Sequence, residues 1–174
     1  AKLQKQSKNM RQTLTKLDLR KPFFEELIDL ARKDKKVILL VGDLGFSFVE
    51  RYAKKFPRQY INVGIMEQSM IGIACGLALG GKKPYVYSGT TFLLMRPYEQ
   101  IRDDMCYNNL DVKLIGTGAA EFLGFSHNLE GTENMEDLLK NLPHLERYYP
   151  NEAQELGRIM RSTHKNKKPT FIRL

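Results

Sequence analysis

One carboxylate, Glu67, stands at the start of a long apolar stretch of the sequence. Ile65 and Met66 precede it, and Met70 and Ile71 follow it at helical spacing. The N-terminus of a helix favours an ionised carboxylate, whereas burial among apolar side chains favours a neutral one. A carboxylate under both influences can share a proton with a nitrogen atom of a ligand. A first-turn glutamate can also simply cap its helix, and the pattern alone leaves both interpretations open.

The residues around Glu67 belong to an alternation of short strands and helices. Short apolar runs predict six strands, at 37–41, 60–63, 84–87, 112–115, 147–149 and 171–173. Helical spacing predicts helices at 22–31, 47–56, 66–79, 92–107, 134–141 and 152–163, the second of them capped by Ser47. The alternation is typical of an α/β fold, a doubly wound, mostly parallel six-stranded sheet with helices on both faces.

Such a sheet also predicts where a ligand binds. Ligands of doubly wound sheets lie beyond the carboxyl ends of the strands. The loops to inspect therefore begin at Gly42, Gly64, Ser88 and Gly116. Glu67 follows the second of these loops, which makes it the first candidate for a functional side chain.

Composition and charge exclude several classes of protein. The chain has 174 residues, 42% of them hydrophobic and 28% charged, which is typical of one globular domain. Its net charge of +8 is concentrated at the ends, because residues 1–21 carry +6 and residues 161–174 carry +5. No nucleic-acid motif accompanies that charge, so we expect no nucleic-acid partner. The longest purely apolar run, 37–41, is too short to span a membrane.

Cysteine usage adds a prediction about the compartment. Cys75 and Cys106 have no CxxC or metal-ligand spacing, and no signal peptide is apparent in residues 1–20. We therefore expect a reduced, cytoplasmic protein with no metal ligands of its own.

The segment from Asn62 to Ala78, NVGIMEQSMIGIACGLA, resembles the pyrimidine-binding domain of transketolase-type thiamine diphosphate enzymes. The nearest likeness is the separately encoded C-terminal half of split bacterial transketolases. The resemblance continues through Phe92, 98–102 and 125–127 to 169–170. It covers about residues 20–173, so we expect a transketolase-like domain over residues 20–174, preceded by a basic N-terminal tail over residues 1–19.

The resemblance assigns the cofactor contacts to four residues. Glu67 matches the glutamate that binds a ring nitrogen of the cofactor's aminopyrimidine and so favours the imino tautomer, whose nitrogen acts as an internal base. Phe92 and Tyr98 match aromatic residues that wall the pyrimidine ring, although an amphipathic helix also buries such residues. Asp43 matches an aspartate beside the cofactor, and its alternative is a turn-forming role.

Three more residues match substrate contacts. Arg20 and Ser47 match residues that hold the sugar phosphate, with a solvated tail and a helix cap as their alternatives. His127 matches a catalytic histidine that contacts an oxygen of the donor, and its alternative is a surface histidine. Leu123 replaces the family's aspartate four residues before that histidine, so the identity of the donor stays open.

Two family features are missing from the sequence. The GDG…N motif that binds the diphosphate and Mg²⁺ is absent, and the third, C-terminal domain has no counterpart before Leu174. We expect a diphosphate-binding partner subunit or domain to hold Mg²⁺, in a homo- or hetero-oligomer that acts on sugar phosphates. Two functions stay open, a component of a transketolase-like enzyme that is inactive alone and a non-catalytic interaction module. Whether the chain is a natural subunit or a fragment also stays open.

Overall fold

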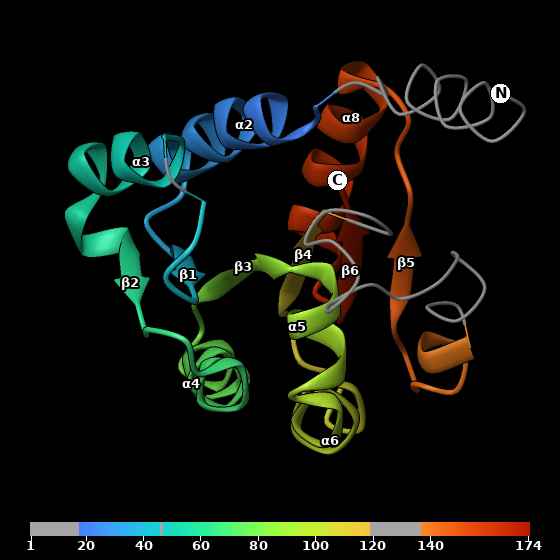
Figure 1. Cartoon of the computed structure of the whole chain (residues 1–174). Helices are drawn as coiled ribbons and strands as arrows, with labels where there is room; N and C mark the ends of the chain where they lie inside the picture. The colour runs from blue at the N-terminus through green and yellow to red at the C-terminus, as the bar shows by residue number, and fades with distance from the viewer. Residues whose placement is uncertain (1–17, 46, 119–136) are drawn as a thin grey trace, which may run out of the picture.

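A computed structural model describes residues 18–45, 47–118 and 137–174 (Figure 1). Six strands form one all-parallel sheet in the order β2-β1-β3-β4-β6-β5. The predicted α/β fold is confirmed, and the sheet is parallel throughout rather than mostly. The strands are β1 (Val37–Val41), β2 (Tyr60–Asn62), β3 (Lys83–Gly89), β4 (Lys113–Thr117), β5 (Glu146–Tyr148) and β6 (Thr170–Arg173).

Helices cover both faces of the sheet, as Figure 1 shows. One face carries α2 (Arg20–Lys33), α3 (Val49–Lys55) and α8 (Ala153–Asn166). The other face carries α4 (Glu67–Leu79), α5 (Thr90–Met95), α6 (Tyr98–Gln100) and the π-helix η2 (Ile101–Cys106). A short 3-10 turn, η1 (Pro57–Gln59), leads into β2.

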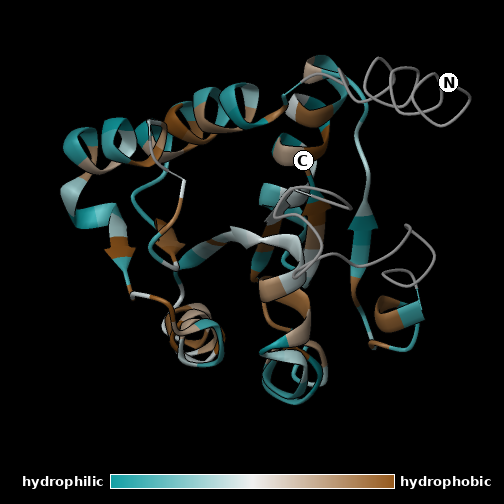
Figure 2. Ribbon diagram, in the orientation of Figure 1, coloured by the Kyte–Doolittle hydropathy of each residue, from teal (hydrophilic) through white to brown (hydrophobic). Residues whose placement is uncertain are grey.

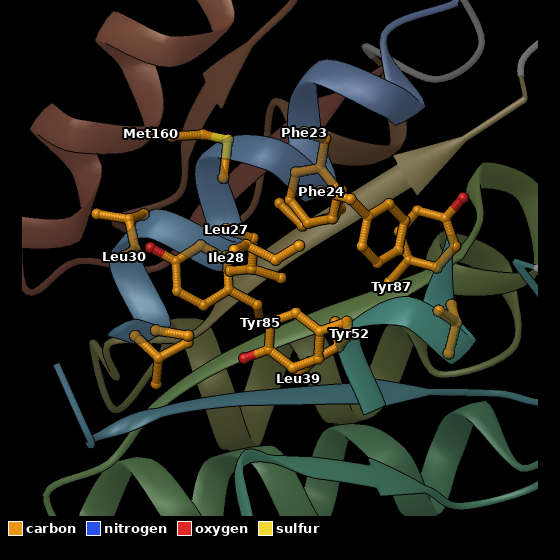
Figure 3. Packing of buried hydrophobic residues seen from close by; sticks show 14 of the residues in the cluster. Phe23, Phe24, Leu27, Ile28, Leu30, Leu39, Tyr52, Tyr85, Tyr87 and Met160 are labelled. Carbon is orange, nitrogen blue, oxygen red and sulfur yellow. The ribbon is translucent and has the colours of Figure 1, made fainter. Parts of the chain in front are cut away.

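Strand β1 is apolar at every position because both of its faces are buried. In β1, Val37, Leu39 and Val41 pack under α2, whereas Ile38 and Leu40 pack on α4. Figure 3 shows the first of these cores, where side chains of α2 lie over those of β1 and β3. Figure 2 shows β1 in the brown of hydrophobic residues, whereas α2 alternates between brown and teal.

The register of the strands brings the predicted loops together. Val41, at the end of β1, is paired with Asn62 of β2 and with Tyr87 of β3. Because the strands are parallel, the loops that follow β1 and β2 and the end of β3 meet at one edge of the sheet. Glu67, the first residue of α4, lies at this edge.

Two local predictions are wrong. The single helix expected over 92–107 is divided into α5, α6 and η2, because Pro97 follows α5 and a proline cannot continue the hydrogen bonding of a helix interior. Ser47 does not cap a helix: α3 begins at Val49 with Phe48 as its N-cap, and Ser47 has a positive φ of 78°.

A polar cluster joins the end of α8 to the amino edge of the sheet. Lys83 Nζ lies 3.0 Å from Asp34 Oδ2, and His164 Nε2 lies 3.2 Å from the same carboxylate oxygen. Tyr85 Oη is hydrogen-bonded to His164 Nδ1 at 3.1 Å. Burial, together with the positive charge of Lys83, lowers the pKa of His164. The imidazole is therefore held in its neutral form at neutral pH.

A second cluster anchors the chain between α8 and β6 through Lys113, a completely buried lysine on β4. Its ammonium group donates hydrogen bonds to Asn166 Oδ1 at 2.9 Å and to the Lys168 carbonyl at 2.7 Å. It also forms an ion pair of 2.7 Å with Asp111. Burial lowers the pKa of Lys113, and these partners compensate for the loss of hydration.

Candidate functional site

The Glu67 carboxylate is buried at the carboxyl edge of the sheet and is held from two sides. Only 2% of its side chain is exposed. Ser88 Oγ, at the end of β3, donates to Oε1 at 3.3 Å. Arg96 Nη1, just after α5, donates to Oε2 at 2.8 Å. A carboxylate offers about four lone-pair positions, so these two donors leave it able to accept from a further group.

The loop before α4 places Glu67 at this edge. Gly64 has a φ of +75°, a backbone conformation that favours glycine. Asn62 Oδ1 accepts hydrogen bonds from the backbone amides of Gly64, at 3.0 Å, and of Asp43, at 3.1 Å. The single Asn62 side chain thus ties together the loops that follow β1 and β2.

The loops that follow β1 and β2 are closely packed around Gly42. A Cβ atom at this position would lie 3.4 Å from the Gly64 carbonyl and 3.7 Å from Glu67 Oε1. A larger side chain here would press on the buried carboxylate and on the loop that carries it. Both distances are ordinary van der Waals contacts, so the two loops are closely packed around Gly42 but leave room for a methyl group.

The Arg96 guanidinium also stacks on an aromatic ring. Its central carbon lies 3.9 Å from the centroid of the Phe92 ring. Phe92 and Arg96 are four residues apart, a spacing that places side chains on one face of a helix. About 40% of the Arg96 side chain is exposed, so the guanidinium joins the buried carboxylate to the protein surface.

An open pocket of about 640 Å³ lies at the start of α4, between Glu67 and Arg96. Its lining also includes Ile65, Met66 and two polar side chains, Gln68 and Ser69. This volume is within the range of about 300–1,000 Å³ that small-molecule sites have. A buried carboxylate beside apolar side chains suits a flat heterocycle that offers a ring nitrogen.

The other predicted cofactor residues do not line this pocket. Asp43 lines a separate pocket of about 170 Å³ with Tyr60 and Asn62, and its carboxylate accepts from Asn62 Nδ2 at 3.1 Å. Phe92 does not line the main pocket, but its ring contacts the guanidinium of Arg96, which does. Tyr98 is half-buried, and its hydroxyl donates to the Leu138 carbonyl at 2.8 Å.

The predicted phosphate ligands lie beside the opposite helical layer. The Arg20 guanidinium forms an ion pair of 2.8 Å with Asp18 and lies 5.7 Å from the centroid of the Phe48 ring. Ser47 is exposed in the loop before α3. His127, like Leu123, lies outside the described residues. The structure therefore places Glu67 in the main pocket and Phe92 against Arg96 of its lining, whereas Arg20 and Ser47 lie beside the opposite helical layer.

Sequence reasoning missed Arg96, and it named Ser88 only as the start of a loop to inspect, without a contact to Glu67. Ser88 is the next-to-last residue of β3, and its position near a strand's carboxyl end was one signal. Arg96 follows Phe92 at helical spacing, which was a second signal. Neither signal identifies the partner, because the contact with Glu67 depends on the packing of α5 against the sheet.

Two classes of feature are not found in the part of the chain that the structure describes. Across residues 18–45, 47–118 and 137–174, no three His, Cys, Asp or Glu side chains are grouped as metal ligands would be. In the same ranges, no helix combines the length and the apolar character needed to cross a bilayer.

Comparison with known proteins identifies relatives over nearly the whole chain. The family described as "Transketolase, pyrimidine binding domain" matches residues 15–174. The 6-deoxy-6-sulfo-D-fructose transketolase subunit SqwH of Clostridium sp. (strain MSTE9) is 33% identical over 162 residues, which are 90% of this chain and 49% of that protein. The putative transketolase C-terminal section of Methanocaldococcus jannaschii is 32% identical over 162 residues, 90% of this chain and 50% of that protein.

A solved structure described as "Split gene transketolase, inactive beta4 tetramer" has the same fold. It superposes with a TM-score of 0.79 at 32% sequence identity, and covers 90% of this chain and 50% of its own. The present chain thus spans about half the length of the curated and solved relatives described above.

Proposed function

The chain belongs to the family of transketolase pyrimidine-binding domains, and on that premise we propose that it is a component of a thiamine diphosphate-dependent enzyme that transfers ketol groups between sugar phosphates. The observation that carries the proposal is the buried carboxylate of Glu67 at the wall of an open pocket. Family membership and this geometry together support an aminopyrimidine as the ligand of the carboxylate.

The residues of the pocket fit an aminopyrimidine ring. Glu67 retains lone pairs that can accept a hydrogen bond from, or share a proton with, a ring nitrogen. The Phe92 ring offers a flat surface for stacking. When bound, thiamine diphosphate supplies a carbon nucleophile, the C2 atom of its thiazolium ring. The task of Glu67 is to hold a proton between its carboxylate and the ring nitrogen, while Ser88 fixes the direction in which the carboxylate points.

The remaining predicted residues complete the proposal. Asp43 lies beside the cofactor and Tyr98 supports the wall of its ring site. Arg20 and Ser47 hold the phosphate of a sugar phosphate, for which a guanidinium and a hydroxyl are suitable donors. His127 contacts an oxygen of the donor. These roles come from the family resemblance, and each is a proposal for this chain.

The proposal includes a partner that binds the diphosphate through Mg²⁺. Exposed apolar side chains gather along α4 and beside the pocket, at Ile61, Ile65, Met66, Ile73 and Leu79. A Cβ added at Gly72 or Gly76 of α4 would meet no atom within 4 Å, so a partner could approach the helix closely. Relatives named as subunits or sections of transketolases further support a partner in an oligomer. Alone, the chain is expected to be inactive.

Hydrogen–deuterium exchange at the thiazolium C2 of bound cofactor tests the role of Glu67. In the complex with the diphosphate-binding partner, Glu67→Gln should slow the exchange by about 10²–10⁴-fold, the range of general acid–base catalysis. Glu25→Gln is the matched control, because Glu25 is an exposed glutamate of α2, and it should leave the rate unchanged. An unchanged rate in Glu67→Gln would reject the catalytic role and favour a non-catalytic interaction module.

A further inference from the structure

The Arg96 guanidinium contacts both groups that bind the aminopyrimidine in the proposed function, the Glu67 carboxylate and the Phe92 ring. It donates to Glu67 Oε2 at 2.8 Å and lies 3.9 Å from the centroid of the Phe92 ring. A guanidinium is flat, carries N–H donors in its plane and stacks on aromatic faces. An aminopyrimidine that shares a proton with Glu67 and stacks on Phe92 has the same combination of properties.

We propose that Arg96 is an internal substitute for the aminopyrimidine ring. Its guanidinium occupies the place of that ring on Glu67 and Phe92, and it must be displaced before the cofactor binds. This inference rests on the proposed function, because that function supplies the ligand. It makes Arg96 a positioning residue that acts through Glu67.

Burial explains why a substitute is needed. The Glu67 side chain is only 2% exposed, and a buried charge without a partner is strongly unfavourable. Arg96 provides the countercharge while the pocket contains no ligand. Because Arg96 keeps about 40% of its own side chain exposed, it can leave for water at moderate cost.

Access to the Glu67 carboxylate explains why Arg96 must be displaced before the cofactor binds. Glu67 and Arg96 both line the pocket of about 640 Å³, and a carboxylate with 2% exposure offers little surface to an incoming ring. A ligand nitrogen reaches it once the guanidinium moves aside. Cofactor binding and the departure of Arg96 are therefore the same event, and the Glu67–Arg96 ion pair lowers the apparent affinity for cofactor.

Titration calorimetry with thiamine diphosphate and Mg²⁺ tests the proposal in the complex of the full chain with its diphosphate-binding partner. Arg96→Met keeps the length of the side chain but removes the guanidinium. We expect this variant to bind the cofactor about 10-fold more tightly, because the half-exposed ion pair and the cation–π contact no longer have to be broken. Arg96→Lys keeps the charge without the flat fork and should fall between Arg96→Met and the wild type.

The matched control is Arg102→Met. Arg102 is an exposed arginine of η2 that pairs with Asp103, and 60% of its side chain is accessible. Its substitution should leave the affinity unchanged. A purely structural role for Arg96 predicts the opposite direction, weaker binding by Arg96→Met, because the pocket would lose a support.

Each outcome of the calorimetry is decisive. Tighter binding by Arg96→Met, with Arg96→Lys intermediate, supports the proposal. Equal or weaker binding by both variants, with normal binding by the wild type, overturns it and leaves the proposed function in place. Absence of cofactor binding in the wild-type complex overturns the proposed function, and the inference with it.

Discussion

Removal of the Arg96 guanidinium should destabilise the isolated chain while no cofactor is present. Breaking a buried ion pair by removing one partner costs about 3–5 kcal/mol. Glu67 is buried, but 40% of the Arg96 side chain is exposed, so part of the interaction is already screened by water. We therefore expect Arg96→Met to lower the free energy of unfolding by about 1–3 kcal/mol.

A double-mutant cycle isolates the contribution of the pair. Glu67→Gln alone should cost less than Arg96→Met, because the remaining guanidinium can be hydrated. The double variant should be more stable than the sum of the single changes predicts, with a coupling energy of about 1–2 kcal/mol. Urea unfolding followed by far-ultraviolet circular dichroism is a suitable assay, because the chain contains no tryptophan.

The refuting result is additivity. Independent sites add within about 0.3–0.5 kcal/mol. If the two single changes add to the double change within that margin, the ion pair contributes nothing to the folded chain, and the reasoning from burial fails for this site.

Two further predictions concern the polar clusters at the amino edge of the sheet. The pKa of His164 is lowered in the folded chain. The contribution of the neutral imidazole to stability is therefore fully present above the unfolded-state pKa of about 6.5, and it is lost as the pH falls below that value. Urea unfolding at pH 7.5 and 5.5 should show a loss of stability at the lower pH in the wild type and a smaller loss in His164→Gln. Equal losses in the two proteins would contradict the role of His164. Lys113→Met should lower the free energy of unfolding, measured with urea, by about 3 kcal/mol, because the ion pair with Asp111 is broken in a buried site. A loss below about 1 kcal/mol would show that the contacts of Lys113 are dispensable for stability.

The sequence predicts the sheet well because its signals are local. The run 37–41 is apolar at every position, which is the pattern of a strand buried on both faces, and β1 has the same bounds. The single helix predicted over 92–107 is wrong because Pro97 interrupts the hydrogen bonding of the helix, although the apolar spacing continues past it. The predicted cap at Ser47 is wrong because a suitable residue type does not ensure the backbone conformation of an N-cap, and Ser47 has a positive φ.

The site was only partly predictable. The position of Glu67 after β2 and at the start of α4 follows from the strand order, because parallel strands bring their carboxyl ends to one edge. The partners of its carboxylate do not follow. Ser88 is 21 residues away and Arg96 is 29 residues away, and such contacts depend on tertiary packing that no short-range pattern encodes.

The most direct test of the central claim is a structure of this chain bound to its diphosphate-binding partner, with thiamine diphosphate and Mg²⁺ present. We predict that a Glu67 carboxylate oxygen lies about 2.6–3.2 Å from a ring nitrogen of the aminopyrimidine, with the Arg96 guanidinium moved away from Glu67. A cofactor ring bound elsewhere, with the Glu67–Arg96 ion pair still intact, would contradict the account.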